Sequence, residues 1–191
     1  MFKCEMTGRS YTDTSDGIWD DGEFISWDWI NGQLYRQERQ AAFPTADEEL
    51  ISVFDELVDV AVRYKEITGR YLPIFGELGE IYAELRYGLK RNRAYACGSD
   101  GRIGNDHVEV KTITPEKKKQ KIQIKRSGNF NKVIVVRISE NFGFESRMFE
   151  RKRLNKGIGK FARISWASLD AEITTDSSCN TQQTVQPPNS P

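Results

Sequence analysis

The clearest periodic pattern in the first half of the chain is helical. From Thr45 onward, apolar residues recur three or four positions apart, and Gly69 follows as a residue suited to end a helix. Thr45 and Glu48 have the spacing of a capping box, so we expect Thr45 to begin this helix. A second helical pattern covers residues 76–87 and is followed by Gly88. The pattern therefore predicts two consecutive amphipathic helices.

The second predicted helix carries three kinds of side chain on different faces. Its apolar face consists of Leu78, Ile81, Tyr82 and Leu85. A stripe of small residues, which would let the helix approach a sheet closely, consists of Gly76, Gly79 and Ala83. Glu80 borders this stripe, whereas Glu77 and Glu84 lie further round the helix. We expect Glu84 to be part of a solvated face.

Beyond residue 95 the pattern changes to that of strands. Apolar and polar residues alternate over 107–113 and 121–125, and 132–138 is a nearly continuous apolar run. Such a run is typical of a central strand that is buried on both faces. A weaker strand is expected over 145–150 and a short helix near 165–169, with turns at 128–129 and 141–143. Helices followed by strands predict an α/β fold with a mixed central sheet flanked by helices.

The two ends of the chain lack these patterns. Residues 1–44 are polar and acidic, with scattered aromatic residues that we expect to anchor short strands or turns on the main domain: Trp19, Phe24, Trp27 and Trp29. The last residues are polar and without periodicity, which predicts disorder. We therefore expect an N-terminal extension at 1–44, a main domain at 45–170 and a disordered tail at 171–191.

Charge is distributed unevenly along the chain. The 191 residues have a formal net charge of zero, but residues 86–163 hold 21 of the 28 Lys and Arg residues and 7 of the 28 Asp and Glu residues. A basic segment of this kind predicts contact with a polyanion, above all nucleic acid. The alternative is that the acidic part folds over the basic part and neutralises it.

Several classes of protein are disfavoured by what the sequence lacks. No apolar run approaches the roughly 20 residues that cross a bilayer, and the N-terminus has no secretory signal pattern, so we expect a cytoplasmic protein. Three widely separated cysteines, Cys4, Cys97 and Cys179, form neither a disulfide framework nor paired zinc ligands. Because His107 is the only histidine, most histidine-dependent hydrolase sites are also disfavoured.

The candidate catalytic residues lie on a predicted hairpin, in the stretch GSDGRIGNDHVEVK from 98 to 111. Glu109 and Lys111 are two residues apart on a strand, so both point to one face. Asp100 would end the preceding strand, so that two carboxylates and one lysine converge at the sheet edge. Carboxylates can hold a hard cation such as Mg²⁺, which polarises a phosphoryl oxygen and helps to generate hydroxide from water. Lys111 could orient that water or stabilise charge on the phosphate.

A helix with Glu, then Asp, then Glu-x-Lys and further strands resembles the PD-(D/E)XK, or restriction-endonuclease-like, nuclease superfamily, in particular small uncharacterised bacterial domains. The resemblance covers roughly residues 74–155. It implies that Asp100 and Glu109 bind Mg²⁺, with Mn²⁺ as a possible substitute, that Lys111 assists the attacking water, and that Glu80 joins the metal site. Ser99 stands in place of the proline of the motif, which is often absent in the family. Glu77 and Asp106 are the rivals of Glu80 and Asp100.

Basic residues downstream of the motif fit contact with DNA. Lysines beside a metal site would hold phosphates, and the candidates are Lys117, Lys118, Lys119, Lys121, Lys125 and Arg126. The sequence thus predicts a Mg²⁺-dependent DNA endonuclease acting in defence, restriction or repair, as a homodimer or with a partner subunit. The alternatives are a non-catalytic module of the same fold that binds nucleic acid or a partner, and an interaction protein whose acidic N-terminal part docks on a basic partner.

Overall fold

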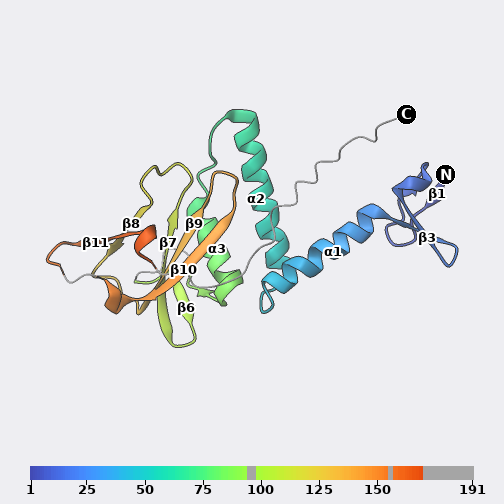
Figure 1. Ribbon diagram of the computed structural model, residues 1–191. Helices are drawn as coiled ribbons and strands as arrows, with labels where there is room; N and C mark the ends of the chain where they lie inside the picture. The colour runs from blue at the N-terminus through green and yellow to red at the C-terminus, as the bar shows by residue number, and fades with distance from the viewer. Residues whose placement is uncertain (94–97, 155–156, 170–191) are drawn as a thin grey trace. The chain divides into compact units, whose positions relative to one another are not determined.

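A computed structural model describes residues 1–93, 98–154 and 157–169 (Figure 1). The chain separates into two compact units, Met1–Val53 and Phe54–Pro191. The division falls within a helix rather than at residue 44, where the sequence pattern changes. The expected tail, 171–191, lies outside the described residues, as does Cys97. In the described part of the chain, no helix has the length and hydropathy that crossing a membrane requires.

The first unit consists of short β-hairpins and one helix. Its elements are β1 (Phe2–Lys3), β2 (Ser10–Tyr11), the 3₁₀ helix η1 (Thr14–Asp16), β3 (Gly17–Asp20), β4 (Glu23–Ser26) and α1 (Trp27–Ala42). The hydroxyl of Ser26 accepts a hydrogen bond from the Trp29 N–H and thereby caps α1. Only strands or turns were expected in this region, so α1 was missed. None of its residues is buried, and its sequence is mostly polar, so few apolar positions mark it as a helix.

One of the four N-terminal aromatic residues singled out in the sequence is a core anchor. Phe24 is buried, and its ring contacts the rings of Phe2, Tyr11 and Trp19. Trp19 and Trp27 are exposed, and Trp29 is half-buried. Phe24 is therefore buried against partners within the first unit itself, whereas packing of these four residues onto the main domain stays a prediction.

Two helices lead into the sheet of the second unit. They are α2 (Glu48–Thr68) and α3 (Phe75–Tyr87). The carboxylate of Asp47 caps α2 by accepting hydrogen bonds from the backbone N–H groups of the second and third helical residues, so Thr45 is not the cap. Gly69 and Gly88 end the two helices with φ angles of +68° and +64°, as the sequence predicted.

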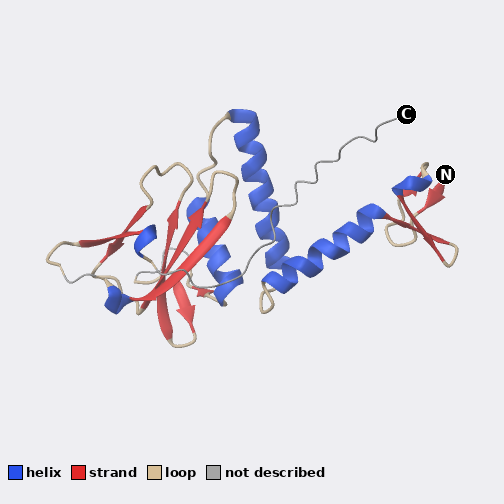
Figure 2. Ribbon diagram, in the orientation of Figure 1, coloured by secondary structure: helices blue, strands red, loops and turns tan. Residues whose placement is uncertain are grey.

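The second unit is built on a five-stranded mixed sheet (Figure 2). Its strands, in spatial order, are β10 (Phe144–Glu150), β9 (Lys132–Ile138), β7 (Asp106–Ile113), β6 (Gly101–Ile103) and β5 (Lys90–Arg91). β7 and β9 are parallel, and the other neighbours are antiparallel. β9 is an interior strand with four consecutive buried residues, which confirms the prediction from its apolar run. A separate pair joins β8 (Lys121–Lys125) to β11 (Phe161–Ser165), a strand that was not predicted.

The two faces of the sheet are covered differently. On one face α3 packs so closely that Gly79 lies against the side chain of Thr112. On the other face, Ile113, Val133 and Phe149 join a buried cluster with β8, β11 and Trp166, which lies in the 3₁₀ helix η3 (Trp166–Ser168). A further 3₁₀ helix, η2 (Arg151–Arg153), follows β10. The α/β class with a mixed sheet is confirmed, but a two-stranded β layer takes the place expected for helices on the second face.

The small-residue stripe of α3 gives a matched pair of substitutions. A Cβ atom at Gly79 would lie 2.1 Å from Thr112 Oγ1, whereas one at Gly76 would meet nothing within 4 Å. Gly79→Ala should therefore lower the free energy of unfolding by about 1–3 kcal/mol through overpacking, less a helix-propensity gain of about 1 kcal/mol. Gly76→Ala should be neutral or stabilising. Urea unfolding followed by circular dichroism measures both, and equal effects would contradict the close approach of α3 to β7.

Candidate active site

The candidate site lies where β6 ends and leaves part of β7 without a neighbour. β6 pairs with residues 106–108 of β7, and no described strand continues along residues 109–113 on that side. Asp100 immediately precedes β6, rather than ending an earlier strand as expected. Its Oδ2 atom accepts a hydrogen bond of 2.6 Å from the Val110 N–H. The carboxylate thus occupies the position that a neighbouring strand's carbonyl group would otherwise take.

Backbone and polar contacts hold Asp100 in place on both sides. The Asp100 N–H donates to the Val108 carbonyl, and the Asn92 N–H donates to the Asp100 carbonyl, each at 2.9 Å. Next to it, the buried Ser99 accepts hydrogen bonds from the Asn92 side chain, and its hydroxyl lies 3.3 Å from His107 Nδ1. The roles of Asn92 and Ser99 could not be predicted from the sequence, because isolated polar residues in a loop produce no periodic signal.

Glu109 and Lys111 point to one face of β7, and the lysine links the two carboxylates. Lys111 Nζ lies 2.6 Å from Glu109 Oε1 and 4.0 Å from Asp100 Oδ2. It also donates a hydrogen bond of 3.0 Å to the Val110 carbonyl. All three side chains are partly exposed, so solvent and a ligand can reach them. The structure therefore brings the carboxylates of Asp100 and Glu109 together around the ammonium group of Lys111.

Glu80 of α3 lies within electrostatic reach of this group. Burial raises the pKa of Glu80, and the negative charges of Asp100 and Glu77 raise it further, against the opposing effect of Arg91 and Lys111. A carboxyl group in this position is easier to protonate than an exposed one. A bound cation would reverse that effect, because it stabilises the ionised form.

Arg91 of β5 distinguishes the three glutamates of α3. Its guanidinium forms ion pairs with Glu77 and, at 2.6 Å, with Glu84, which lie two helical turns apart. Glu77 is thus already engaged away from the β7 edge, which favours Glu80 as the helical member of the site. The expectation that Glu84 is merely solvated is wrong, because it is half-buried in this ion pair.

Asp106, the rival of Asp100, lies on the other side of the sheet. It is the first residue of β7 and shares the parity of Val108 and Val110, opposite to that of Glu109. Its carboxylate forms an ion pair of 2.8 Å with Lys132. Asp106 therefore points away from the Glu109 and Lys111 side chains.

The carboxylates at the edge of β7 supply part of the ligand set that Mg²⁺ requires. In the described part of the chain, no three His, Cys, Asp or Glu side chains are close enough to form a complete metal site. Mg²⁺ is usually held by only one or two carboxylates, with waters and substrate phosphates filling the other positions. Asp100 and Glu109 supply such a pair of hard oxygen ligands. The residues present are therefore compatible with Mg²⁺, although Lys111 would have to move away from Glu109.

Five of the six predicted nucleic-acid-binding residues are exposed. Lys117, Lys118 and Lys119 lie in the loop between β7 and β8, and Lys121 and Lys125 lie on the outer face of β8. The sixth, Arg126, is half-buried, and its carbonyl accepts a hydrogen bond from Arg151. The lysines are thus exposed to a polyanion, whereas Arg126 is half-buried and bound to Arg151.

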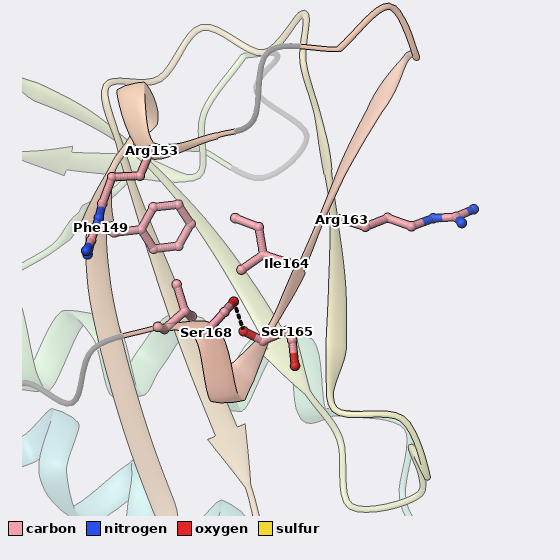
Figure 3. A pocket seen from close by; sticks show the side chains of 7 residues that line it. Phe149, Arg153, Arg163, Ile164, Ser165 and Ser168 are labelled. Carbon is pink, nitrogen blue, oxygen red and sulfur yellow. Dashed lines mark hydrogen bonds between the residues drawn. The ribbon is translucent and has the colours of Figure 1, made fainter.

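The chain also has a hollow between β10, β11 and η3 (Figure 3). It is lined by Phe149, Arg153, Arg163, Ile164, Ser165, Ser168 and Leu169. Figure 3 shows Phe149 and Ile164 pointing toward each other, whereas Arg153 and Arg163 extend away in different directions. The Ser168 hydroxyl donates a 2.7 Å hydrogen bond to the Ser165 carbonyl. Among the described residues that line this hollow, no charged groups converge, so the edge of β7 is the better candidate.

Comparison with known proteins does not assign the chain to a family: no protein-family model and no curated protein matches it at a significant level.

The raised pKa of Glu80 predicts a pH-dependent effect of Glu80→Gln. Because the pKa of Glu80 is higher in the folded than in the unfolded chain, protonation of Glu80 favours the folded state. This stabilisation is fully present at a pH below the unfolded-state pKa of about 4.3 and is lost as the pH rises through the folded-state pKa. Without metal, Glu80→Gln should therefore increase the free energy of unfolding at pH 8, by less than about 1 kcal/mol because solvent screens a half-exposed group. The gain should shrink toward pH 4. Urea unfolding in EDTA at both pH values measures it, and a loss of stability at pH 8 would contradict the effect.

Proposed function

We propose that the chain is a metal-dependent nuclease that hydrolyses DNA phosphodiester bonds. The observation that carries the proposal is the convergence of Asp100, Glu109 and Lys111 at the uncovered edge of β7. The residue types and their order along the chain also support membership of the PD-(D/E)XK superfamily, and the mixed sheet behind an α-helix is compatible with that fold. Defence, restriction and repair are the settings in which such an activity would operate.

Each residue has a role in this proposal. Asp100 and Glu109 would hold Mg²⁺ or Mn²⁺, with Glu80 supporting them from α3. The ion would supply charge stabilisation at the phosphoryl oxygens and lower the pKa of a bound water. Lys111, released from Glu109, would donate a hydrogen bond that orients the attacking water. In the overall reaction a water oxygen bonds to phosphorus, one ester P–O bond breaks, and the departing oxygen takes up a proton.

The outer face of the β8–β11 pair supports a role in binding nucleic acid. On this face Lys125 pairs across the strands with Phe161, and Gln123 pairs with Arg163. Phe161 is exposed, and the Lys160 ammonium lies 5.7 Å from the centre of its ring. Exposed cations can contact phosphates, and an exposed aromatic ring beside them can stack on an unpaired base. We propose that this face and the lysines of the preceding loop hold the DNA.

A second candidate function is a binding module of the same fold without turnover. The observation that favours it is the ion pair itself, because Lys111 already compensates the charge of Glu109. An ion pair of this kind has a purely structural explanation and does not require a metal. The two candidates differ in whether a divalent cation changes the fate of bound DNA.

Cleavage of supercoiled plasmid, linear duplex and single-stranded DNA in Mg²⁺, Mn²⁺ or EDTA tests the proposal. We expect cutting that requires the metal and that is lost in Glu109→Gln. DNA binding that weakens with salt but leads to no cutting would instead support the binding module. Failure to bind any nucleic acid would contradict both and would favour the interaction protein.

A further inference from the structure

Helix α2 carries two apolar stripes, and only one of them faces the core. Residues of the inner stripe are largely buried and include Ile51, Phe54 and Ala61. The second stripe follows alternating steps of three and four residues and consists of Leu50, Val53, Leu57, Val60, Tyr64 and Ile67. Such spacing is the a/d repeat of a coiled coil, sustained here for two and a half heptads.

The second stripe is open to solvent along most of its length. Val53, Val60 and Ile67 have exposed fractions of 43%, 45% and 77%. The other members, Leu50, Leu57 and Tyr64, are half-buried. A continuous apolar seam of this length on a single helix indicates an interaction surface rather than scattered surface residues.

Charged residues beside the seam indicate what covers it. We propose that α2 pairs with the α2 of a second copy of this chain in an antiparallel, two-fold symmetric dimer. Antiparallel pairing places Leu57 of one copy against Val60 of the other, and Leu50 against Ile67. The same register places Glu56 of each copy beside Arg63 of the other. Among the described residues neither Glu56 nor Arg63 forms an ion pair within the chain.

A parallel pair does not fit the same helix. In parallel coiled coils the residues preceding a, here Glu56 and Arg63, face the residues following d on the partner helix. For Glu56 and Arg63 of α2 those residues are Ala61, which is buried in this chain's own packing, and Thr68, which carries no charge. Only the antiparallel arrangement brings opposite charges together on the solvent side. The proposal does not depend on the nuclease activity, because it concerns a different surface.

Sedimentation velocity of the full chain over about 1–100 µM tests the dimer. Wild type should dimerise reversibly. Glu56→Arg and Arg63→Glu should each raise the dissociation constant at least about tenfold, because each creates two like-charge contacts. The double variant Glu56→Arg/Arg63→Glu should restore dimerisation to within about threefold of wild type. Circular dichroism should be unchanged in all three, since both side chains are exposed.

Two results would overturn this assignment. A chain that stays monomeric at every concentration would mean that the seam is covered by another segment or left bare. A dimer that withstands the single charge reversals, or is not restored in the double variant, would mean that copies associate through another surface. Val60→Lys adds a direct check, since a charge in the middle of the seam should abolish the dimer.

Discussion

Replacing Lys111 with methionine is expected to abolish DNA cleavage while leaving Mg²⁺ binding intact or tighter. The ammonium of Lys111 lies between two carboxylates, so its removal leaves both free to accept a divalent cation. Cleavage should fall by about a hundredfold or more, because a positioned donor contributes that much to reactions of charged transition states. Titration with Mn²⁺ followed by electron paramagnetic resonance measures metal binding separately from turnover. The combination of retained metal and lost activity is specific to a lysine that acts on water or phosphate.

Two matched variants make this result interpretable. Glu109→Gln should weaken metal binding at least about tenfold and lose cleavage together with it, because it removes a charged ligand. Asp106→Asn alters an acidic residue three positions away on the opposite face of β7, and cleavage should stay within about threefold of wild type. Cleavage that survives Lys111→Met or depends on Asp106 would disprove the site assignment. If Lys111→Met also lost metal binding, the ion pair between Lys111 and Glu109 would have only a structural role on β7.

Replacing Trp166 with alanine should cost the second unit about 3–5 kcal/mol in the free energy of unfolding. Trp166 is 4% exposed and packs in the cluster that covers the sheet face opposite α3. The guanidinium carbons of Arg147 and Arg137 lie 4.2 and 4.9 Å from the centre of a Trp166 ring. Arg147 also donates a hydrogen bond of 2.7 Å to the Trp166 carbonyl. Losing the ring would leave a cavity and expose these contacts to water.

Phe161→Ala is the control for that measurement. Phe161 lies on β11, next to η3 in the chain, but is 46% exposed on the outer face of the strand pair. Its replacement should change stability by less than about 1 kcal/mol, as is usual for surface substitutions. Urea unfolding followed by circular dichroism compares the two variants. Equal losses would contradict the packing described for the second face.

The elements predicted correctly are those whose pattern is local. The helix at 76–87 and the strands at 121–125 and 132–138 each carry their own periodicity, so few neighbours are needed to predict them. β11 was missed because it becomes a strand by pairing with β8, about 40 positions earlier in the chain. The helix α1 was missed for the opposite reason, since it has no buried face at all.

The sequence alone was sufficient to bring Glu109 and Lys111 to one face, because strand parity is a local property. It also indicated Asp100 as their companion, through order and spacing. The tertiary structure decided how Asp100 reaches them: β6 is short, and the carboxylate accepts the Val110 N–H that an adjoining strand would have taken. No local pattern reports where a neighbouring strand ends.

The glutamates of α3 show the same division between local and long-range information. Helical spacing placed Glu77, Glu80 and Glu84 around the helix but could not assign their partners. Arg91, contributed by β5, binds Glu77 and Glu84 and leaves Glu80 in the field of Asp100. Periodicity determines which way a side chain points along its own element, whereas the charge that it meets there depends on elements that the fold brings close from elsewhere in the chain.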